Sequence, residues 1–196
     1  MRVLVIGATG VIGSAVAEAF DGAGHEVVRA SRKGEHRVDI TDRASIRALF
    51  EKIGAVDAVV SCAGAAIFKP VGELTDGDVE EATRLKVSAN IDVVRLGVDR
   101  VSDGGQFILT TGIFSTRPIA GVPLIAMVNG ALESFVRAAA LDLPRDIRIN
   151  AVCPLFINET AEQMGMKGDC SAAENANGYL ELATGSESGS IVTPGL

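Results

Sequence analysis

The stretch Val3–Phe20, VLVIGATGVIGSAVAEAF, decides the fold because a glycine-rich turn separates two apolar segments. The apolar residues before Gly7 are typical of a buried strand, and helical spacing runs over residues 11–23. The glycines at positions 7, 10 and 13 let the turn close and let backbone N–H groups approach a phosphate. The start of a helix adds a dipole that favours an anion. This unit predicts a pyrophosphate site of a dinucleotide, and a tight turn without a ligand is the alternative.

Apolar segments of strand length alternate with helical patterns along the rest of the chain. The expected strands are residues 2–6, 26–30, 58–61, 106–111, 148–152 and 190–193. The expected helices are residues 11–23, 44–53 (with Asp42 as cap), 78–101, 123–142 and 172–183. Parallel strands need crossover connections, so this order predicts an α/β fold, a Rossmann-like doubly wound parallel sheet with helices on both faces. We expect one domain over residues 1–196, with 155–189 as its least defined part.

The charge and the apolar runs exclude two classes of partner. The net charge is −7, and no block of lysine and arginine exceeds two residues, so a nucleic-acid surface is not expected. No apolar run reaches the roughly 20 residues that a membrane span needs. The three cysteines share no metal-binding spacing, which favours reduced thiols, a cytoplasmic location and no metal site.

The residues after the second expected strand select between two dinucleotides. An acidic residue there would hydrogen-bond a free ribose 2′-hydroxyl, but the chain has Ser31, Arg32 and Lys33. Ser31 can donate to a 2′-phosphate, and Arg32 can pair with it. We therefore expect NADP(H) to be preferred over NAD(H), with a solvated basic turn as the alternative.

Six segments together resemble the short-chain dehydrogenase/reductase family over nearly the whole chain. They are GATGVIG (7–13), RVDITD (37–42), SCAGAA (61–66), GGQFILTTG (104–112), NGALESFVRAAALDL (129–143) and RINAVCP (148–154). The resemblance implies a sheet of about seven strands, although the chain is short for this family. The cofactor-binding residues that follow from the resemblance and the two preceding arguments are Gly7, Thr9, Gly10, Val11, Ile12, Gly13, Ser31, Arg32, Asp39, Ile40, Cys62, Ala63, Gly64 and Ile157.

The resemblance also implies where these residues meet the cofactor. Asp39 is expected to contact the adenine and Ile40 to stack near it. Residues 62–64 would lie along the ribose, and the backbone near Ile157 would meet the carboxamide. Val11 stands where the commonest pattern of the family has a glycine.

The catalytic residues of the family are only partly present. Its tyrosine falls at Ile125, and its lysine, four residues later, falls at Asn129. The only tyrosine in the chain is Tyr179, far along the sequence, so no shift within residues 117–129 supplies one. The serine of the family falls at Thr110 or Thr111, and a threonine hydroxyl can still donate.

The asparagine of the family falls at Lys86, or at Asn90 if the helix is shifted by one turn. Lys86 and Asn129 therefore resemble an exchange of the two residues between neighbouring helices. The alternative is a solvated lysine on a helix that also carries Glu80 and Glu81.

We expect the catalytic set to be Thr111, Lys86 and Asn129. Lys86 would hold the nicotinamide ribose and polarise the substrate region. The expected activity is the reduction of a small carbonyl, or the oxidation of an alcohol, in a non-standard active site. The alternative is a catalytically inactive NADP(H)-binding sensor or partner-binding protein.

Two further expectations concern surfaces. The helices 78–101 and 123–142 form the usual dimer surface of the family that the chain resembles, and the second is apolar on more than one face. This predicts a homodimer or homotetramer. Phe156, Met164 and Met166 either line a small apolar pocket or pack in the core, and core packing is favoured.

Overall fold

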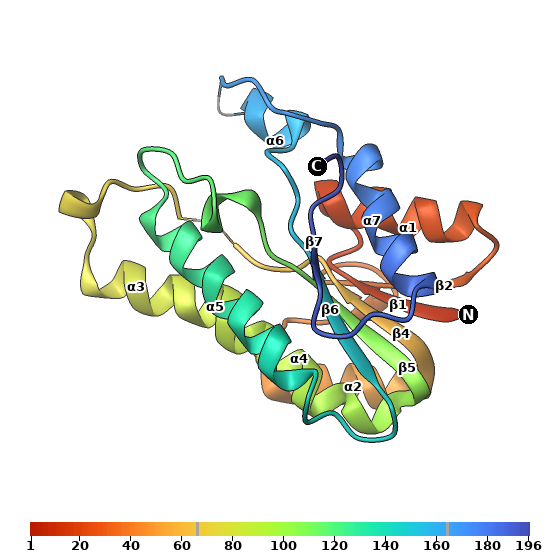
Figure 1. Cartoon of the computed structure of the whole chain (residues 1–196). Coiled ribbons are helices and arrows are strands. Elements are labelled where there is room, and N and C mark those ends of the chain that lie inside the picture. Colours follow the sequence, from red (N-terminus) through yellow and green to blue (C-terminus); the bar gives the residue numbers. More distant parts are fainter. Residues whose placement is uncertain (66, 164) are drawn as a thin grey trace.

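Seven parallel strands form one sheet with the order β3-β2-β1-β4-β5-β6-β7 in the computed structural model (Figure 1), which describes residues 1–65, 67–163 and 165–196. The strand order reverses beside β1, so the chain winds first toward one edge of the sheet and then toward the other. The strands are β1 (Arg2–Ile6), β2 (Glu26–Ser31), β3 (His36–Arg37), β4 (Val56–Ser61), β5 (Val101–Thr110), β6 (Arg148–Val152) and β7 (Ile191–Val192). The predicted doubly wound fold is confirmed.

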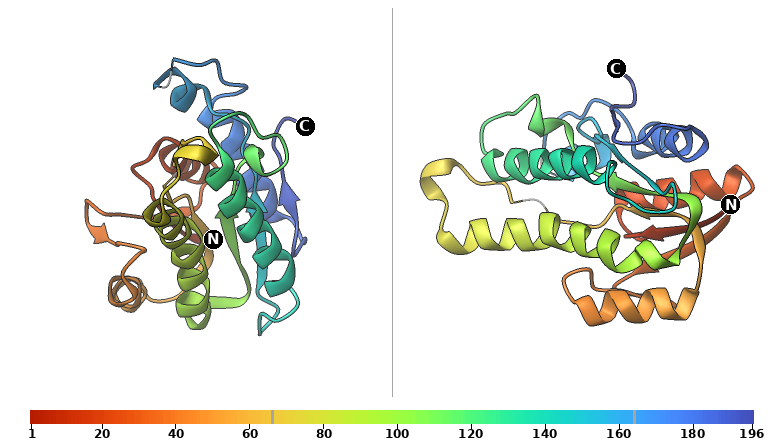
Figure 2. Two further views of the ribbon diagram at one scale, coloured as in Figure 1. Left: turned by 90° about the vertical axis from the view of Figure 1, so that its left-hand side faces the viewer. Right: turned by 60° about the horizontal axis from the view of Figure 1, so that its bottom comes forward.

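Helices cover both faces of the sheet (Figure 2). On one face, α1 (Val11–Gly22) packs against α7 (Ala172–Thr184), and their apolar residues share a core with β1 and β4. On the other face, α2 (Arg43–Ile53), α4 (Ala89–Gly97) and α5 (Pro123–Ala139) bury the larger core. The remaining helical segments are α3 (Asp76–Ala82), the π-helical η2 (Thr83–Ser88), α6 (Asn158–Gln163) and the short turns η1 (Val71–Glu73), η3 (Val98–Arg100) and η4 (Ile113–Ser115).

Most of the predicted elements are confirmed within one or two residues, including the cap of α2. The Asp42 side chain accepts a hydrogen bond from the Ala44 N–H at 2.9 Å. Two differences occur near the N-terminus. The sequence prediction missed the two-residue β3, and Val11, where the apolar helical spacing begins, is 37% exposed. Val11 is the first residue of α1, where the helix has not yet reached the core.

The predicted single helix over residues 78–101 is wrong in its bounds and its regularity. The segment starts at Asp76, widens into the π-helical η2, continues as α4 and gives way to β5 at Val101. A π-helical turn breaks the regular backbone ladder. The Lys86 carbonyl oxygen within this turn accepts from the Ala89 N–H, and the Asn90 Nδ2 also donates to it, at 2.7 Å.

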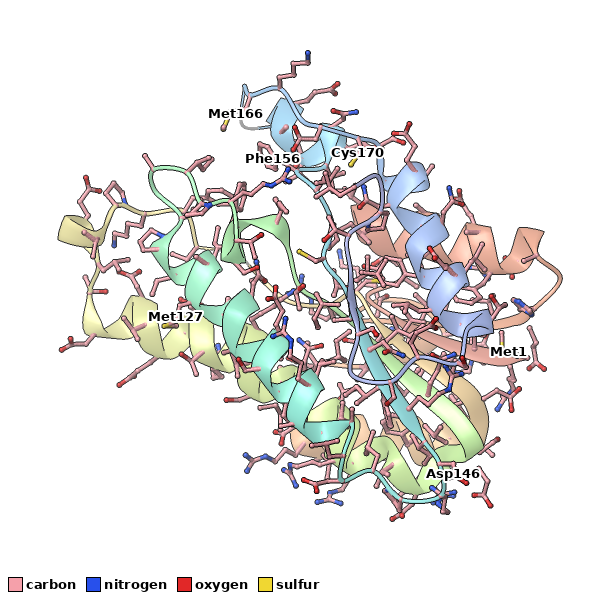
Figure 3. All side chains as sticks on the ribbon, in the orientation of Figure 1. Met1, Met127, Asp146, Phe156, Met166 and Cys170 are labelled. Atoms are coloured by element: carbon pink, nitrogen blue, oxygen red, sulfur yellow. The ribbon has the colours of Figure 1, made fainter. Side chains whose placement is uncertain are left out.

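The segment between β6 and α7 carries α6, and its two ends are tied together. The Asp169 N–H donates to the Phe156 carbonyl oxygen at 2.7 Å. Figure 3 shows Phe156 near this base and Met166 farther out. Met166 is 41% exposed, so the expected core packing is wrong for it, and Met164 lies outside the described residues. In the parts of the chain that the structure describes, no helix combines the length and hydropathy needed to span a membrane.

We predict that Gly13→Ala lowers the free energy of unfolding by about 1–3 kcal/mol or more, because overpacking forces the backbone to move. A Cβ at residue 13 would lie 2.1 Å from the Gly7 carbonyl oxygen. Gly22→Ala in the same helix is the matched control, because a Cβ there meets nothing within 4 Å. Urea unfolding should show Gly22→Ala as stable as the parent or more so; equal stability of the two variants would contradict the prediction.

Candidate functional site

The glycine turn after β1 brings two strand ends into contact. Gly7 has a φ of +85°, and a Cβ on it would lie 2.9 Å from the Ala63 backbone nitrogen. The Gly7 N–H also donates to the Ala30 carbonyl oxygen at 2.8 Å. The carboxyl ends of β1, β2 and β4 therefore meet around this glycine, at the edge where doubly wound sheets bind ligands.

An outer cavity of about 720 Å³ opens at this edge. Ten of the predicted cofactor residues line it: Gly7, Thr9, Gly10, Ser31, Arg32, Asp39, Ile40, Cys62, Ala63 and Gly64. The other four lie elsewhere. Gly13 is buried under the turn, Val11 is exposed at the start of α1, and Ile12 and Ile157 line a second cavity. The size and the glycine-lined floor of the outer cavity fit a dinucleotide.

Cations gather at the end of the outer cavity that the β2 terminus forms. Arg32, Lys33 and Arg84 all line it, and Asp39 faces them. Hydrogen bonds from the Thr41 hydroxyl and N–H, with smaller contributions from Arg32 and Arg84, lower the pKa of Asp39. Arg84 was not among the residues expected from the sequence, because its position in the chain is far from β2 and only folding brings the two to the same cavity.

Ser31 is less available than its sequence position suggests. Its hydroxyl donates to the Lys33 carbonyl oxygen and also accepts from the Lys33 N–H at 3.2 Å. The residue is buried, so in this structure it shapes the turn that presents Arg32.

An inner cavity of about 280 Å³ adjoins the outer one and shares Cys62, Gly64 and Ala65 with it. All three expected catalytic residues line it, namely Lys86, Thr111 and Asn129. Its apolar lining combines aliphatic side chains with three phenylalanines from separate segments, Phe68, Phe114 and Phe156. The Phe68 and Phe114 rings meet edge to face at 6.4 Å, and those of Phe114 and Phe156 lie 5.3 Å apart. Phe156 thus lines the cavity and also packs, partly buried, against the apolar cluster that includes Ile113 and Phe114, so both roles considered from the sequence apply to it.

Thr110, the last residue of β5, and Thr111, which follows it, differ in how firmly hydrogen bonds hold their hydroxyls. The Thr110 hydroxyl donates to the Ser61 carbonyl oxygen at 2.8 Å and lies 2.8 Å from the Tyr179 hydroxyl. Among the described residues, the Thr111 hydroxyl makes a weaker contact, 3.4 Å to the Val152 carbonyl oxygen, and it also interacts with the Cys153 thiol. Thr111 is therefore the hydroxyl that can turn toward a bound molecule.

Asn129 is held on the opposite wall. Its Nδ2 donates to the Gly112 carbonyl oxygen at 3.2 Å, and its residue is buried. The amide thus fixes the backbone after β5. Ile125, one turn earlier on α5, is buried in an apolar cluster with Ile113 and Phe114.

Lys86 projects from η2 across the backbone of Gly64. A Cβ on Gly64 would lie 2.7 Å from Lys86 Cδ, so the glycine makes room for the lysine stem. Burial lowers the pKa of Lys86 to about 8, and the nearby Cys62 opposes this change. Lys86 and Asn129 line one cavity, although no hydrogen bond joins their side chains in the described structure.

Tyr179 lies beneath the site rather than in it. The residue is fully buried in α7 and lines neither cavity, while its hydroxyl reaches Thr110 from below. Burial raises the pKa of Tyr179 well above its usual value. Burial likewise raises the pKa of the Cys62 thiol to about 11, against the Thr110 hydrogen bond and the Lys86 charge.

We predict that Tyr179→Phe lowers the free energy of unfolding by about 1 kcal/mol, the usual net value of one hydrogen bond. It should leave the affinity for a nicotinamide dinucleotide unchanged, because Tyr179 lines neither cavity. Thr110→Val and the double variant complete a mutant cycle in urea unfolding. A coupling energy of zero, or a loss of cofactor affinity in Tyr179→Phe, would contradict this assignment.

The chain is similar to several solved structures along nearly its full length. The protein lin1944 from Listeria innocua is 38% identical, with a TM-score of 0.93 and 98% of both chains covered. A small-chain dehydrogenase solved in complex with NADPH is 25% identical, with a TM-score of 0.87, covering 98% of this chain and 95% of that one.

Among curated proteins, the hydroxynaphthalene reductase arp2 of Aspergillus fumigatus is 28% identical over 180 residues, which is 89% of this chain. The chain spans 64% of the length of that reductase, which is less than two thirds. The family model described as enoyl-(acyl carrier protein) reductase matches residues 7–182. With the sheet order and the glycine turn, this match shows that the chain belongs to the short-chain dehydrogenase/reductase family of oxidoreductases.

Proposed function

We propose that this protein is an NADP(H)-dependent oxidoreductase that interconverts a small carbonyl compound and its alcohol in a non-standard active site. The observation that carries the proposal is the pair of joined cavities. The outer one has the glycine floor and the cationic end, and the inner one has an ammonium, a hydroxyl and an amide. A single dinucleotide-binding domain over residues 1–196 would supply all of these groups.

Ten residues around the outer cavity would hold the cofactor. Gly7, Thr9 and Gly10 offer backbone N–H groups to the pyrophosphate, Asp39 and Ile40 flank the adenine, and Cys62, Ala63 and Gly64 follow the ribose. The backbone of Ile157 would reach the carboxamide, with Val11, Ile12 and Gly13 beginning the helix that faces the phosphates. When bound, NADPH supplies the hydride that reduces the carbonyl carbon.

The preference for NADP(H) is supported by charge. Arg32, Lys33 and Arg84 converge on one end of the outer cavity, where guanidinium groups can pair with a 2′-phosphate. The NADPH-bound dehydrogenase of similar fold is consistent with this choice.

The active site would work without the tyrosine of the family. Thr111 hydrogen-bonds the substrate oxygen, Lys86 holds the nicotinamide ribose and polarises the substrate region, and Asn129 keeps the wall after β5 in place. Loss of a general acid typically costs about 10²–10⁴ in rate, which slows catalysis without abolishing it.

The inner cavity limits the substrate. About 280 Å³ accommodates a small molecule, and three phenylalanines provide flat apolar contacts. A compound with one ring beside its carbonyl group fits both properties. The similar hydroxynaphthalene reductase, by its name, also acts on an aromatic compound.

The protein would be located in the cytoplasm. It would form a homodimer or a homotetramer. The three cysteines are free thiols, as a reducing compartment favours. The outer face of α5 exposes Met127, Ala131 and Ser134, which leaves a shallow surface for a second helix. The dimer contact would use residues 78–101 and 123–142.

We predict that the protein oxidises NADPH in the presence of small monocyclic ketones or aldehydes and is slower with larger ones. Absorbance at the NADPH band across a size-graded panel of carbonyl compounds measures this. Phe114→Ala should shift the preference toward larger rings. Tight NADPH binding without turnover of any compound would instead favour a sensor or partner-binding protein.

We predict that Arg32→Ala weakens NADPH binding by about 10-fold or more, since a charge-assisted pair contributes roughly 1.5–3 kcal/mol. Arg84→Ala should act in the same direction, and neither should alter NADH binding. Titration by cofactor fluorescence tests this, with the exposed Arg47 on α2 as control in Arg47→Ala. Equal affinities of the parent for NADPH and NADH would refute the preference.

We predict an oligomer in solution, in contrast to the 20.3 kDa of one chain. Ala131→Glu places a carboxylate on the outer face of α5 and should release monomers. The same change at the exposed Ala44 of α2 should not. Light scattering at micromolar concentration gives the masses, and a monomeric parent would count against the proposed surface.

A further inference from the structure

The inner cavity offers few groups that could give a proton to a substrate. Among the described residues that line it, the side chains with an exchangeable proton are Cys62, Lys86, Thr110, Thr111, Asn129 and Thr160. Threonine hydroxyls and amides do not ionise near neutral pH. The Cys62 thiol, with a pKa raised to about 11, is a weaker acid than the Lys86 ammonium, and Tyr179 lines neither cavity. Lys86 is therefore the strongest acid among the side chains that line the inner cavity.

Two backbone features set the position of the Lys86 side chain: the π-helical turn that carries it and the glycine at position 64 beside its stem. The π-helical η2 widens the helix at this residue, and Asn90 binds the Lys86 carbonyl oxygen at 2.7 Å. Gly64 clears the path of the stem, since a Cβ there would lie 3.4 Å from Nζ as well as 2.7 Å from Cδ. The ammonium is thereby directed to the junction that both cavities share.

The charged groups near this junction leave the Lys86 ammonium without an acidic partner in the described structure. Cys62, directly after β4, is the titratable group that acts on the ammonium, and it raises the pKa of Lys86. Other groups are engaged elsewhere: Glu133 of α5 accepts from the Ser115 hydroxyl at 2.6 Å, and Lys69 pairs with Asp78 at 2.8 Å.

Arg84 shares η2 with Lys86 but lines the outer cavity, where Asp39 and Arg32 also lie. Buried ammonium groups without a carboxylate lose their proton more easily than exposed ones. Desolvation is the larger influence on Lys86, and its pKa falls to about 8.

We propose that Lys86 is the proton donor of the reaction, taking the part that a tyrosine plays elsewhere in the family. This inference rests on the proposed function. After hydride has reached the carbonyl carbon, the substrate oxygen carries a negative charge. An N–H bond of the Lys86 ammonium breaks, an O–H bond forms to give the alcohol, and the electron pair of the broken bond stays on Nζ. The neutral amine then regains a proton from water at the cavity mouth.

This role sets the direction of the pH dependence. Only the protonated amine can donate, so the rate of carbonyl reduction is full below the pKa of Lys86 and falls as the pH rises through about 8. Alcohol oxidation needs the neutral amine and should rise over the same range.

The first test compares Lys86→Arg with Lys86→Ala. Arginine keeps the charge but does not release a proton near neutral pH. We expect Lys86→Arg to retain NADPH binding within a few-fold by fluorescence titration while its turnover falls about 10²–10⁴-fold. Small primary amines added to Lys86→Ala should restore part of the turnover in proportion to their concentration. Lys52→Ala, at an exposed lysine of α2, is the control.

The second test needs no turnover. The five lysines of the chain give few signals in carbon NMR with ¹³Cε label. One should titrate near pH 8 and vanish in Lys86→Met, while ordinary lysines titrate near about 10.4.

Full turnover by Lys86→Arg, or no lysine titrating below about pH 9.5, would overturn this role for Lys86. In either case the proposed function stands if the parent still reduces carbonyl compounds. A parent protein that reduces none of them overturns the proposed function and, with it, the donor role.

Discussion

The close approach of two backbones at Gly7 is the contact on which the rest of the site depends. Because Gly7 has no side chain, the end of β1 lies against Ala63, directly after β4. Because Gly13 has none, α1 starts against the carbonyl of Gly7. The outer cavity is the space that these contacts leave at the carboxyl edge of the sheet, and Cys62, Gly64 and Ala65 form the wall that it shares with the inner cavity.

A second constraint follows from the side chains that two neighbouring helical segments bring to the inner cavity, a lysine from η2 and an asparagine from α5. Asn129 on α5 is neutral and short, so it can satisfy the Gly112 carbonyl within a buried helix face. Lys86 is long and charged, and it reaches the cavity from η2. The charge therefore enters beside Cys62 and Gly64, on the wall that both cavities share, rather than from α5.

The sequence predicted those features that local patterns determine. The glycine turn, the Asp42 cap and the alternation of buried strands with helices are all encoded within a few residues, and the structure confirms them. The two-residue β3 has no apolar period to find, since only two backbone pairings with β2 define it. Arg84 reaches the outer cavity, and Tyr179 reaches Thr110 beneath the site, through contacts between distant parts of the chain; 69 positions separate Thr110 from Tyr179. The Ser31 hydroxyl is occupied by a hydrogen bond to the Lys33 carbonyl oxygen. That bond depends on the backbone conformation of the turn, which residue types alone do not specify.

The π-helical turn at η2 divides one helical segment into two parts with different surroundings. Arg84 and Lys86, within the π-helical turn, line the two cavities. Val93 and Val94, on α4 after the turn, are buried in the core against α2 and β5. A substitution within η2 therefore changes the lining of the groove, whereas a substitution at the buried positions of α4 changes the packing of the core.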